Sequence, residues 1–268
     1  MSELVDVDGL AVEVSGPAGG MPVLFGHSLL LDRRMFEAQV ADLAHEFRVF
    51  NIDFRGHGGS AVPPRGFTIL QQAEDYEKVL DHFGLESAAI VGLSMGGMAA
   101  MHFAIAHPGR VRGLVLMNTS ARREPPRARA KEMALAVSAR LFGVRPFIRK
   151  QVEPLMFGER FRAERPDIVS EWSDRMGALD RTGLYRGVMM VLSRPAVGPR
   201  LVDVRAPTMV IAGDHDVATP PELGQEIADA IPGAVFRLLP RTGHISTVEE
   251  PVLTTKLIRA HLEQVARG

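Results

Sequence analysis

The sequence predicts an α/β protein: a mostly parallel, eight-stranded sheet with helices on both faces and an inserted helical cap. Short apolar runs alternate with amphipathic helical patterns along most of the chain, as in parallel strands joined by right-handed crossovers. Residues 88–104 read as a strand, a sharp glycine-rich turn and a helix. Between residues 121 and 197 the strand pattern stops and only helical segments remain.

The first part of the chain alternates strands and helices in order. An Asp8-Gly9 turn joins two alternating segments into a predicted hairpin. Apolar residues from Ile69 to Phe83 recur at helical spacing, and Gly84 follows as a C-terminal glycine should. The expected strands are residues 4–8, 10–14, 22–26, 47–53, 88–91 and 111–118, and the expected helices are residues 36–47, 69–83 and 98–104.

The sheet pattern returns near Pro207, with strands expected at 207–213 and 235–240 and helices beginning near Pro220 and after Pro251. The simplest organisation is a core of residues 1–120 and 198–268, with a cap of residues 121–197 inserted after the sixth strand. Four cap helices are expected, at 127–142, 144–157, 166–179 and 182–193. We expect the large apolar residues of the cap to be core contacts or pocket lining: Met133, Leu141, Phe147, Met156, Phe157, Trp172, Met176, Met189 and Met190.

Charge is divided unevenly between the two parts. The whole chain has a formal net charge of −1, whereas residues 121–197 carry 16 Lys and Arg against 9 Asp and Glu. Solvated helix faces explain most of these arginines, but a basic cap would also concentrate an anionic substrate. A carboxylate-binding role for a cap arginine therefore stays open.

Overall composition fits a globular enzyme of 268 residues, 46% hydrophobic and 24% charged. The near-neutral charge gives no reason to expect a nucleic-acid partner. No apolar run approaches the ~20 residues that span a bilayer, and the acidic N-terminal segment does not resemble a signal peptide. The chain contains no cysteine. We therefore expect a cytoplasmic protein without disulfides, without a membrane partner and without a cofactor.

The sequence Gly92-Leu93-Ser94-Met95-Gly96 is the most informative motif of the chain. It lies between an apolar strand and a helix, so Ser94 is expected at the apex of a tight turn, where glycines remove side chains that would collide. The free N–H groups at the start of the following helix favour a developing negative charge. This context predicts that Ser94 is a nucleophile.

A serine nucleophile needs a base, and the base needs an orienting acid. His244 follows one predicted strand, and Asp214 and Asp216 follow its predecessor. The carboxyl ends of strands are where open α/β sheets place their sites. Either carboxylate is a candidate from position alone, since the two flank His215.

The remaining histidines have structural explanations. His57 lies in a glycine-rich turn, and His27 is expected to shape its loop by hydrogen bonding. Residues 45, 82 and 261 are expected at the surface, and 102 and 107 lie on or just after the helix that follows Ser94. No pair has HExxH-type spacing and cysteine is absent. No metal site is expected.

The chain resembles the α/β-hydrolase superfamily over nearly its whole length. The resemblance lies in the loop Phe25-Gly26-His27-Ser28-Leu29, the segment DFRGHGGS from Asp53, the motif GLSMGG, the loop GDHDVATP and the motif TGH. Within the superfamily the chain is most similar to 3-oxoadipate enol-lactonases and related carboxylesterase-type members. One departure is that Met35-Phe36 stands where an aromatic residue, often tryptophan, follows the HG loop. The only tryptophan is Trp172.

The resemblance implies a nucleophile, Ser94, a general base and acid, His244, and an orienting carboxylate, Asp216, with Asp214 as its rival. It also implies an oxyanion hole formed by the backbone N–H groups of Leu29 and Met95. The expected substrate is a small-molecule carboxylic ester or lactone, including an anionic enol-lactone, cleaved through an acyl-enzyme.

Three other functions stay open on sequence. The same residues serve cofactor-free perhydrolases of the non-haem haloperoxidase type, C–C bond hydrolases, and hydrolase-fold proteins that bind a ligand with little turnover. Epoxide hydrolases and haloalkane dehalogenases are excluded, because they need a carboxylate where this chain has Ser94.

Overall fold

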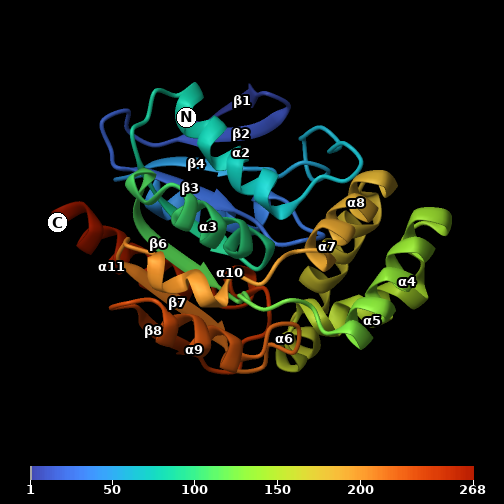
Figure 1. Ribbon diagram of the computed structural model, residues 1–268. Helices are drawn as coiled ribbons and strands as arrows, with labels where there is room; N and C mark the ends of the chain where they lie inside the picture. The colour runs from blue at the N-terminus through green and yellow to red at the C-terminus, as the bar shows by residue number, and fades with distance from the viewer. Residues whose placement is uncertain (1) are drawn as a thin grey trace.

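The computed structural model describes residues 2–268, and its centre is an eight-stranded sheet in the spatial order β1-β2-β4-β3-β5-β6-β7-β8 (Figure 1). β1 and β2 form the predicted hairpin, β2 pairs antiparallel with β4, and every other neighbouring pair is parallel. The predicted mostly parallel sheet is confirmed. The strands are β1 (Glu3–Val7), β2 (Leu10–Ser15), β3 (Pro22–Gly26), β4 (Arg48–Ile52), β5 (Ala88–Leu93), β6 (Val111–Met117), β7 (Thr208–Gly213) and β8 (Val235–Leu239).

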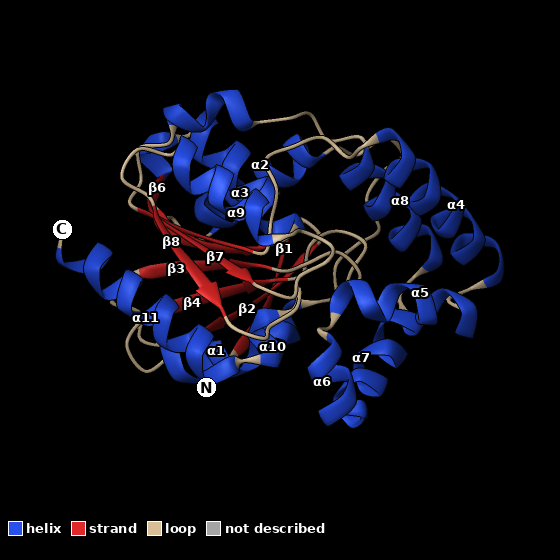
Figure 2. Cartoon of the chain, turned by 90° about the horizontal axis from the view of Figure 1, so that it is seen from below, coloured by secondary structure: helices blue, strands red, loops and turns tan. Residues whose placement is uncertain are grey.

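Helices cover both faces of the sheet, as predicted (Figure 2). One face carries α1 (Glu37–Leu43), α10 (Ser246–Glu249) and α11 (Pro251–Arg267), and the other carries α2 (Ile69–His82), α3 (Met95–Ala106) and α9 (Pro221–Ala230). The expected helix at 36–47 is a 3₁₀ turn, η1 (Arg33–Phe36), followed by α1. Two further 3₁₀ turns, η2 (Pro108–Arg110) and η3 (Gly198–Asp203), precede β6 and β7.

The centre of the core is the unit formed by β5 and α3. All six residues of β5 are buried, as a parallel strand covered on both faces must be. α3 is apolar around most of its circumference, because it lies between the sheet and α2 and has little contact with solvent. This packing fixes the turn between β5 and α3 that carries Ser94.

Five helices, here called the cap helices, lie between β6 and β7 in the chain and beside the sheet in space (Figures 1 and 2). The four expected helices are present, and the structure adds a short fifth, α6. The independence of residues 121–197 as a domain stays a prediction. The cap helices are α4 (Pro126–Phe142), α5 (Pro146–Met156), α6 (Glu159–Glu164), α7 (Pro166–Ala178) and α8 (Arg181–Leu192).

The expectation that the large apolar cap residues are core contacts or pocket lining agrees with the burial of Met156, Phe157, Trp172, Met176 and Met190, but it is wrong for three others. Met133, Leu141 and Phe147 are 41%, 62% and 51% exposed. They lie on α4 and at the start of α5, so the amphipathic spacing correctly indicated helices but not which side of them is buried. Among residues 2–268, no helix has both the length and the apolar character needed to cross a membrane.

Candidate active site

Ser94 lies at the apex of the turn between β5 and α3 with φ 53° and ψ −112°. A non-glycine residue rarely adopts this left-handed conformation, and strained residues of this kind are concentrated at functional sites. Glycines make the turn possible: a Cβ on Gly96 would overlap the carbonyl oxygen of Gly26, and one on Gly92 would come within 2.6 Å of the Gly96 backbone. The predicted strand–turn–helix geometry around Ser94 is confirmed.

The loops after β5, β6, β7 and β8 meet at one edge of the sheet, because these four strands are parallel neighbours. The loop after β6 carries Asn118 and Thr119, which form hydrogen bonds to each of the other three loops. Thr119 donates its hydroxyl to the carbonyl oxygen of Ser94 at 2.8 Å, and the Asn118 amide donates to Asp216 at 2.9 Å and to the carbonyl of Gly243 at 3.2 Å. The structure therefore brings the sequence-predicted residues Ser94, Asp216 and His244 to one place.

The carboxylate that contacts His244 is Asp216. Its Oδ2 lies 2.8 Å from Nδ1 of His244, whereas Asp214 accepts the backbone N–H of Thr242 at 3.2 Å. Asp216 also accepts the hydroxyl of Thr219 at 2.7 Å and the N–H groups of residues 218 and 219, both at 2.9 Å. Position in the sequence did not distinguish Asp214 from Asp216, but this hydrogen bond does.

Asp216 is 3% exposed, and burial by itself would raise the pKa of its carboxyl group. The neighbouring His244, the hydrogen bonds from Thr219 and the amide of Asn118 act in the opposite direction. Their combined effect holds the pKa of Asp216 below its ordinary value of 3.8. Asp216 is therefore ionised at neutral pH and is suited to orient an imidazole and stabilise its protonated form.

Ser94 and His244 are 7% and 3% exposed, so little solvent reaches either side chain. No hydrogen bond joins the Ser94 hydroxyl to the His244 ring in the described part of the chain. Hydrogen bonds of catalytic groups are often long without substrate and shorten in the complex.

Two backbone N–H groups, those of Met95 and Leu29, have no acceptor among residues 2–268. Met95 is the first residue of α3, so its N–H has no intrahelical acceptor. In the loop after β3, the N–H of Ser28 points to the sulfur of Met35, that of Leu30 to His57 and that of Leu31 to the Ser28 carbonyl. Leu29 is the one residue of this run whose N–H has no partner among residues 2–268.

His27 and His57 hold the loop that carries Leu29. His27 is fully buried, with Nδ1 2.7 Å from the Ser28 carbonyl and Nε2 accepting the N–H of Phe54 at 2.8 Å, which confirms its predicted hydrogen-bonding role. Nε2 of His57 accepts the N–H of Leu30 at 3.4 Å. Burial, mainly, and the neighbouring His27 lower the pKa of His57 to about 3. His57 is therefore neutral, and its Nε2 can accept a hydrogen bond. The sequence did not predict this contact between His57 and the loop that carries Leu29.

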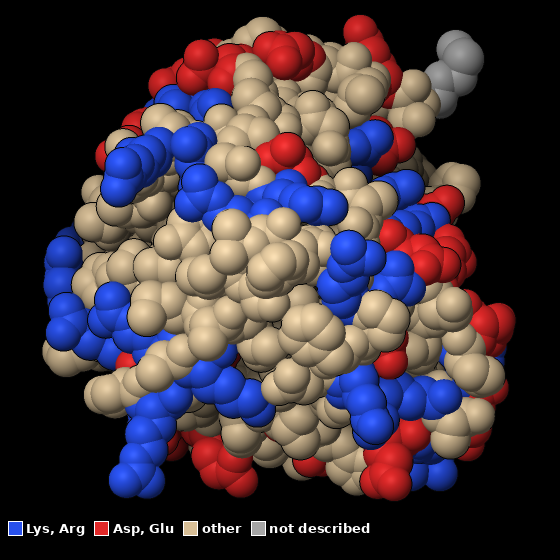
Figure 3. Space-filling model, turned by 90° about the vertical axis from the view of Figure 1, so that its right-hand side faces the viewer, with Lys and Arg blue, Asp and Glu red and all other residues tan. Residues whose placement is uncertain are grey.

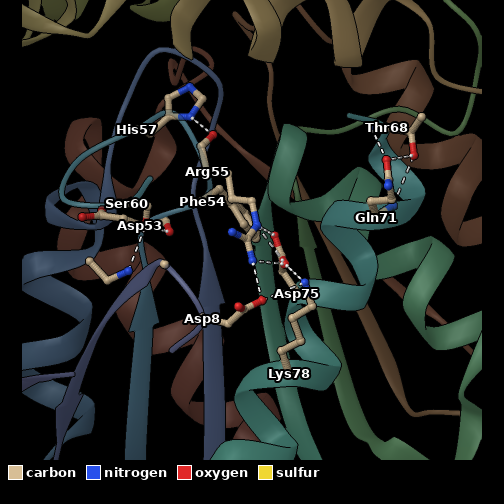
Figure 4. Close-up of polar contacts among 12 residues, drawn as sticks. Asp8, Asp53, Phe54, Arg55, His57, Ser60, Thr68, Gln71, Asp75 and Lys78 are labelled. Atoms are coloured by element: carbon tan, nitrogen blue, oxygen red, sulfur yellow. Dashed lines mark hydrogen bonds and ion pairs between the residues drawn. The ribbon is translucent and has the colours of Figure 1, made fainter. Parts of the chain in front are cut away.

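The loop that presents His57 is anchored to α2 (Figure 4). Arg55 extends from this loop to the fully buried Asp75, with nitrogen–oxygen distances of 3.0–3.2 Å, and Lys78 and Asp8 complete the cluster. By binding Arg55, the Asp75 carboxylate holds in place the loop that carries His57. These charged groups are structural, and none of them contacts Ser94.

Glu249 is a second residue that sequence reasoning missed. Its carboxylate accepts the N–H of Gly243, next to His244, at 2.9 Å and the N–H of Gly158, in the cap, at 3.1 Å. Burial raises the pKa of Glu249 to about 7, although the two amide hydrogen bonds and His244 lower it. In the sequence, Glu249 is marked only by its position five residues after His244. That spacing does not indicate a contact until the fold is known. Glu249 links the histidine loop to the cap.

A family model described as the alpha/beta hydrolase fold matches residues 21–158, more than half of the chain. The chain belongs to the α/β-hydrolase family. The matched region contains the loop after β3, the Ser94 turn and the first two cap helices. Asp216 and His244 lie beyond it, in the loops that follow the last two strands of the same sheet.

Relatives of known name are similar over nearly their whole length. 3-Oxoadipate enol-lactonase 2 of Acinetobacter baylyi is 29% identical over 249 residues, covering 93% of this chain and 91% of the relative. A thermophilic esterase from Thermogutta terrifontis, solved with malate bound, is 31% identical with a TM-score of 0.91, covering 99% of both chains. The enol-lactonase of Burkholderia xenovorans LB400 is 29% identical with a TM-score of 0.89, covering 97% of this chain and 100% of that chain. These relatives are enol-lactonases and an esterase. The prediction that this chain is a hydrolase of ester or lactone bonds is thus confirmed.

Proposed function

We propose that this hydrolase cleaves carboxylic esters or lactones through a covalent acyl-enzyme on Ser94. The observation that carries the proposal is the Asp216–His244 hydrogen bond of 2.8 Å at the sheet edge where the strained Ser94 turn also lies. An imidazole held by a buried carboxylate beside a serine at a strand–helix turn is the arrangement that activates a hydroxyl for attack on a carbonyl carbon. The enol-lactonase and esterase relatives support the same chemistry.

In the first step His244 accepts the proton of the Ser94 hydroxyl as its oxygen attacks the substrate carbonyl. The carbonyl oxygen becomes an oxyanion, and the N–H groups of Leu29 and Met95 donate to it. Donors of this kind, fixed in place before the reaction, are worth roughly 3 kcal/mol each in acyl transfer. Asp216 stabilises the imidazolium and keeps Nε2 directed at the reacting atoms.

His244 then returns its proton to the leaving oxygen as the carbonyl–oxygen bond breaks, and the acyl group stays on Ser94. Water enters, His244 takes one of its protons, and the resulting hydroxyl attacks the acyl carbon. Collapse of the second tetrahedral intermediate returns the proton to Ser94 and releases the acid. With a lactone, the leaving oxygen and the acid belong to one product molecule.

An anionic acyl or leaving group fits the charge of the chain. The cap segment carries seven more basic than acidic residues, and a positive surface near a buried site raises the local concentration of anions. The enol-lactone named for the relatives retains a carboxylate, and the Thermogutta esterase was solved with malate, a dicarboxylate. We therefore expect esters or lactones that carry a carboxylate to be preferred to neutral ones of equal size.

The test is a substrate panel with wild type, Ser94→Ala and His244→Ala. The panel contains p-nitrophenyl esters, neutral and carboxylate-bearing lactones, a dienoic diketo acid, and acetate with peroxide. We expect ester or lactone turnover by wild type and a loss of about 10⁴-fold or more in either variant, because the residues act as a unit. Turnover of the diketo acid alone would indicate a C–C hydrolase, and turnover of acetate with peroxide alone a perhydrolase. Binding without any turnover would indicate a ligand-binding protein.

A further inference from the structure

The outer face of α4 carries an apolar stripe that none of residues 2–268 covers. α4 packs on α8 through Ala136 and Ala139, which are 3% and 4% exposed. On the opposite face, Met133, Val137 and Leu141 follow one another at intervals of four residues and are 41%, 39% and 62% exposed. Single exposed apolar side chains are normal, but a continuous row along a helix marks a contact surface. We call Ala130, Met133, Ala134, Val137 and Leu141 the α4 stripe.

Basic side chains border the α4 stripe on both sides. With 100° between successive helical residues, Arg129 and Arg140 lie along one border and Arg127 and Lys131 along the other. None of these four forms an ion pair in the described part of the chain. Figure 3 shows this side of the molecule, where Lys and Arg side chains surround an area without charged groups.

The surface continues into the next helix with the same character. Phe142 and Phe147, at the end of α4 and the start of α5, are 58% and 51% exposed. Residues 126–150 contain seven basic residues and one acidic residue, Glu132. Arg149 pairs with Asp174, and none of the other six basic residues forms an ion pair within residues 2–268.

We propose that the α4 stripe and its basic borders bind the surface of an anionic lipid bilayer, with α4 lying in the plane of the interface. An apolar helix face flanked by Lys and Arg buries its apolar side chains among the acyl chains and places its cations beside anionic headgroups. Such peripheral contact needs no membrane-spanning helix. The expectation of no membrane partner rested on the lack of a spanning segment, which says nothing about contact at the surface.

Charge favours a lipid surface over a second copy of this chain. A symmetric dimer through α4 would place the same patch on both subunits, so basic borders would face basic borders. An anionic bilayer complements both the apolar stripe and its borders. The α4 stripe lies on the outer side of the cap, away from Ser94, so the contact is independent of the proposed chemistry.

The test is co-sedimentation of the full-length protein with vesicles of phosphatidylcholine alone or mixed with phosphatidylglycerol. We expect wild type to sediment with the anionic vesicles and to be released by high salt, which screens exposed charges. The double variant Val137→Glu/Leu141→Glu should lower the partition coefficient at least tenfold, about the effect of losing two apolar anchors and adding two like-charge repulsions. A variant with one border neutralised, Arg129→Gln/Arg140→Gln, should also bind more weakly and retain the stripe.

The matched control is Val252→Glu on α11, since Val252 is 84% exposed and lies outside the cap. It should bind vesicles like wild type, and all variants should keep the circular dichroism spectrum and the ester hydrolysis rate of wild type. Failure of wild type to sediment with anionic vesicles at low salt would overturn the proposal. The proposal would also be overturned if wild type did not bind vesicles and light scattering showed a dimer that Leu141→Glu dissociates. The α4 stripe would then be a self-association surface.

Discussion

Among the single residues of the candidate site, the carboxylate that contacts His244 is Asp216 and not its neighbour Asp214. Asp216 is bound to His244 Nδ1, and four further donors hold the carboxylate in place: the Asn118 amide, the Ala218 N–H, and the N–H and hydroxyl of Thr219. Asp214 is only two residues away, but its carboxylate supports the backbone of Thr242 instead. The two carboxylates therefore have different functions, although their positions in the sequence are nearly equivalent.

We predict that Asp216→Asn lowers kcat by about 10⁴-fold, the effect known when the acid of such a triad is replaced by its amide. The amide keeps the shape of the side chain but cannot stabilise the imidazolium or fix the correct tautomer of His244. Asp214→Asn is the matched control and should lower kcat less than about tenfold, as expected for loss of one hydrogen bond in a supporting loop. Steady-state kinetics on one ester measure both, and a larger loss for Asp214→Asn would reverse the assignment.

At the scale of the elements, the turn between β5 and α3 depends on close backbone approach. Gly96 lies against the carbonyl of Gly26 at the end of β3, and Tyr76 on α2 donates its hydroxyl to the Gly96 carbonyl at 3.1 Å. Three elements thus meet at a point that has no room for a side chain.

We predict that Gly96→Ala lowers the free energy of unfolding by about 3 kcal/mol, because its methyl group would force β3 and α3 apart in a fully packed core. Gly109→Ala is the matched control: nothing lies within 4 Å of a Cβ at that position, so its effect should stay within about 0.5 kcal/mol. Urea unfolding of the two variants measures the difference. Equal stability of both would show that the turn is less tightly packed than the distances indicate.

Glu249 makes the link between the histidine loop and the cap dependent on pH. Its pKa is raised from 4.5 to about 7, so the native protein binds this proton more tightly than the unfolded chain does. This contribution to stability is therefore complete below about pH 4.5 and is lost as the pH rises through about 7.

We predict that wild type loses about 2 kcal/mol of free energy of unfolding relative to Glu249→Gln when the pH rises from 5 to 7.5. Taking the difference removes the effect of other titrating groups. The neighbouring Glu250→Gln is the control, because Glu250 is partly exposed and pairs with Arg160 at the surface. A difference that does not vary with pH would contradict the raised pKa of Glu249.

The sequence predicted the elements well wherever periodicity and local turn chemistry determine them. The eight strands, the Asp8-Gly9 hairpin and the helix after Ser94 follow from such local signals. The short helix α6 was missed because six residues carry less than two turns of periodicity. The apolar spacing of α4 predicted a helix correctly, but the expectation that Met133 and Leu141 are core contacts or pocket lining was wrong, since amphipathic spacing does not say what covers the apolar face.

For the candidate site, the sequence predicted the residues that a motif marks and missed those that act through tertiary contacts. Ser94, Asp216 and His244 lie at strand ends and come together as expected. The contact of His57 with the Leu30 amide and the bridge of Glu249 between Gly158 and Gly243 join segments up to 91 residues apart. No local pattern encodes such contacts, so only the fold shows them.

At the scale of the whole molecule, the parallel order of β5 to β8 creates the site. Each of these strands delivers one loop to the same edge of the sheet, and the cap helices lie beside that edge in Figure 1. The cap reaches the histidine loop directly, because Ile245 donates its N–H to the Met156 carbonyl at 3.1 Å and Glu249 bridges to Gly158. Two contacts therefore hold the loop that carries His244 to the cap.

In the proposed function the Asp216–His244 pair activates the hydroxyl of Ser94. This is tested by the intact mass of wild type, Ser94→Ala and the control Ser120→Ala after incubation with a small fluorophosphonate. We predict one phosphonyl adduct on wild type and on Ser120→Ala and none on Ser94→Ala. An unmodified wild-type protein, or an adduct that persists on Ser94→Ala, would contradict the claim.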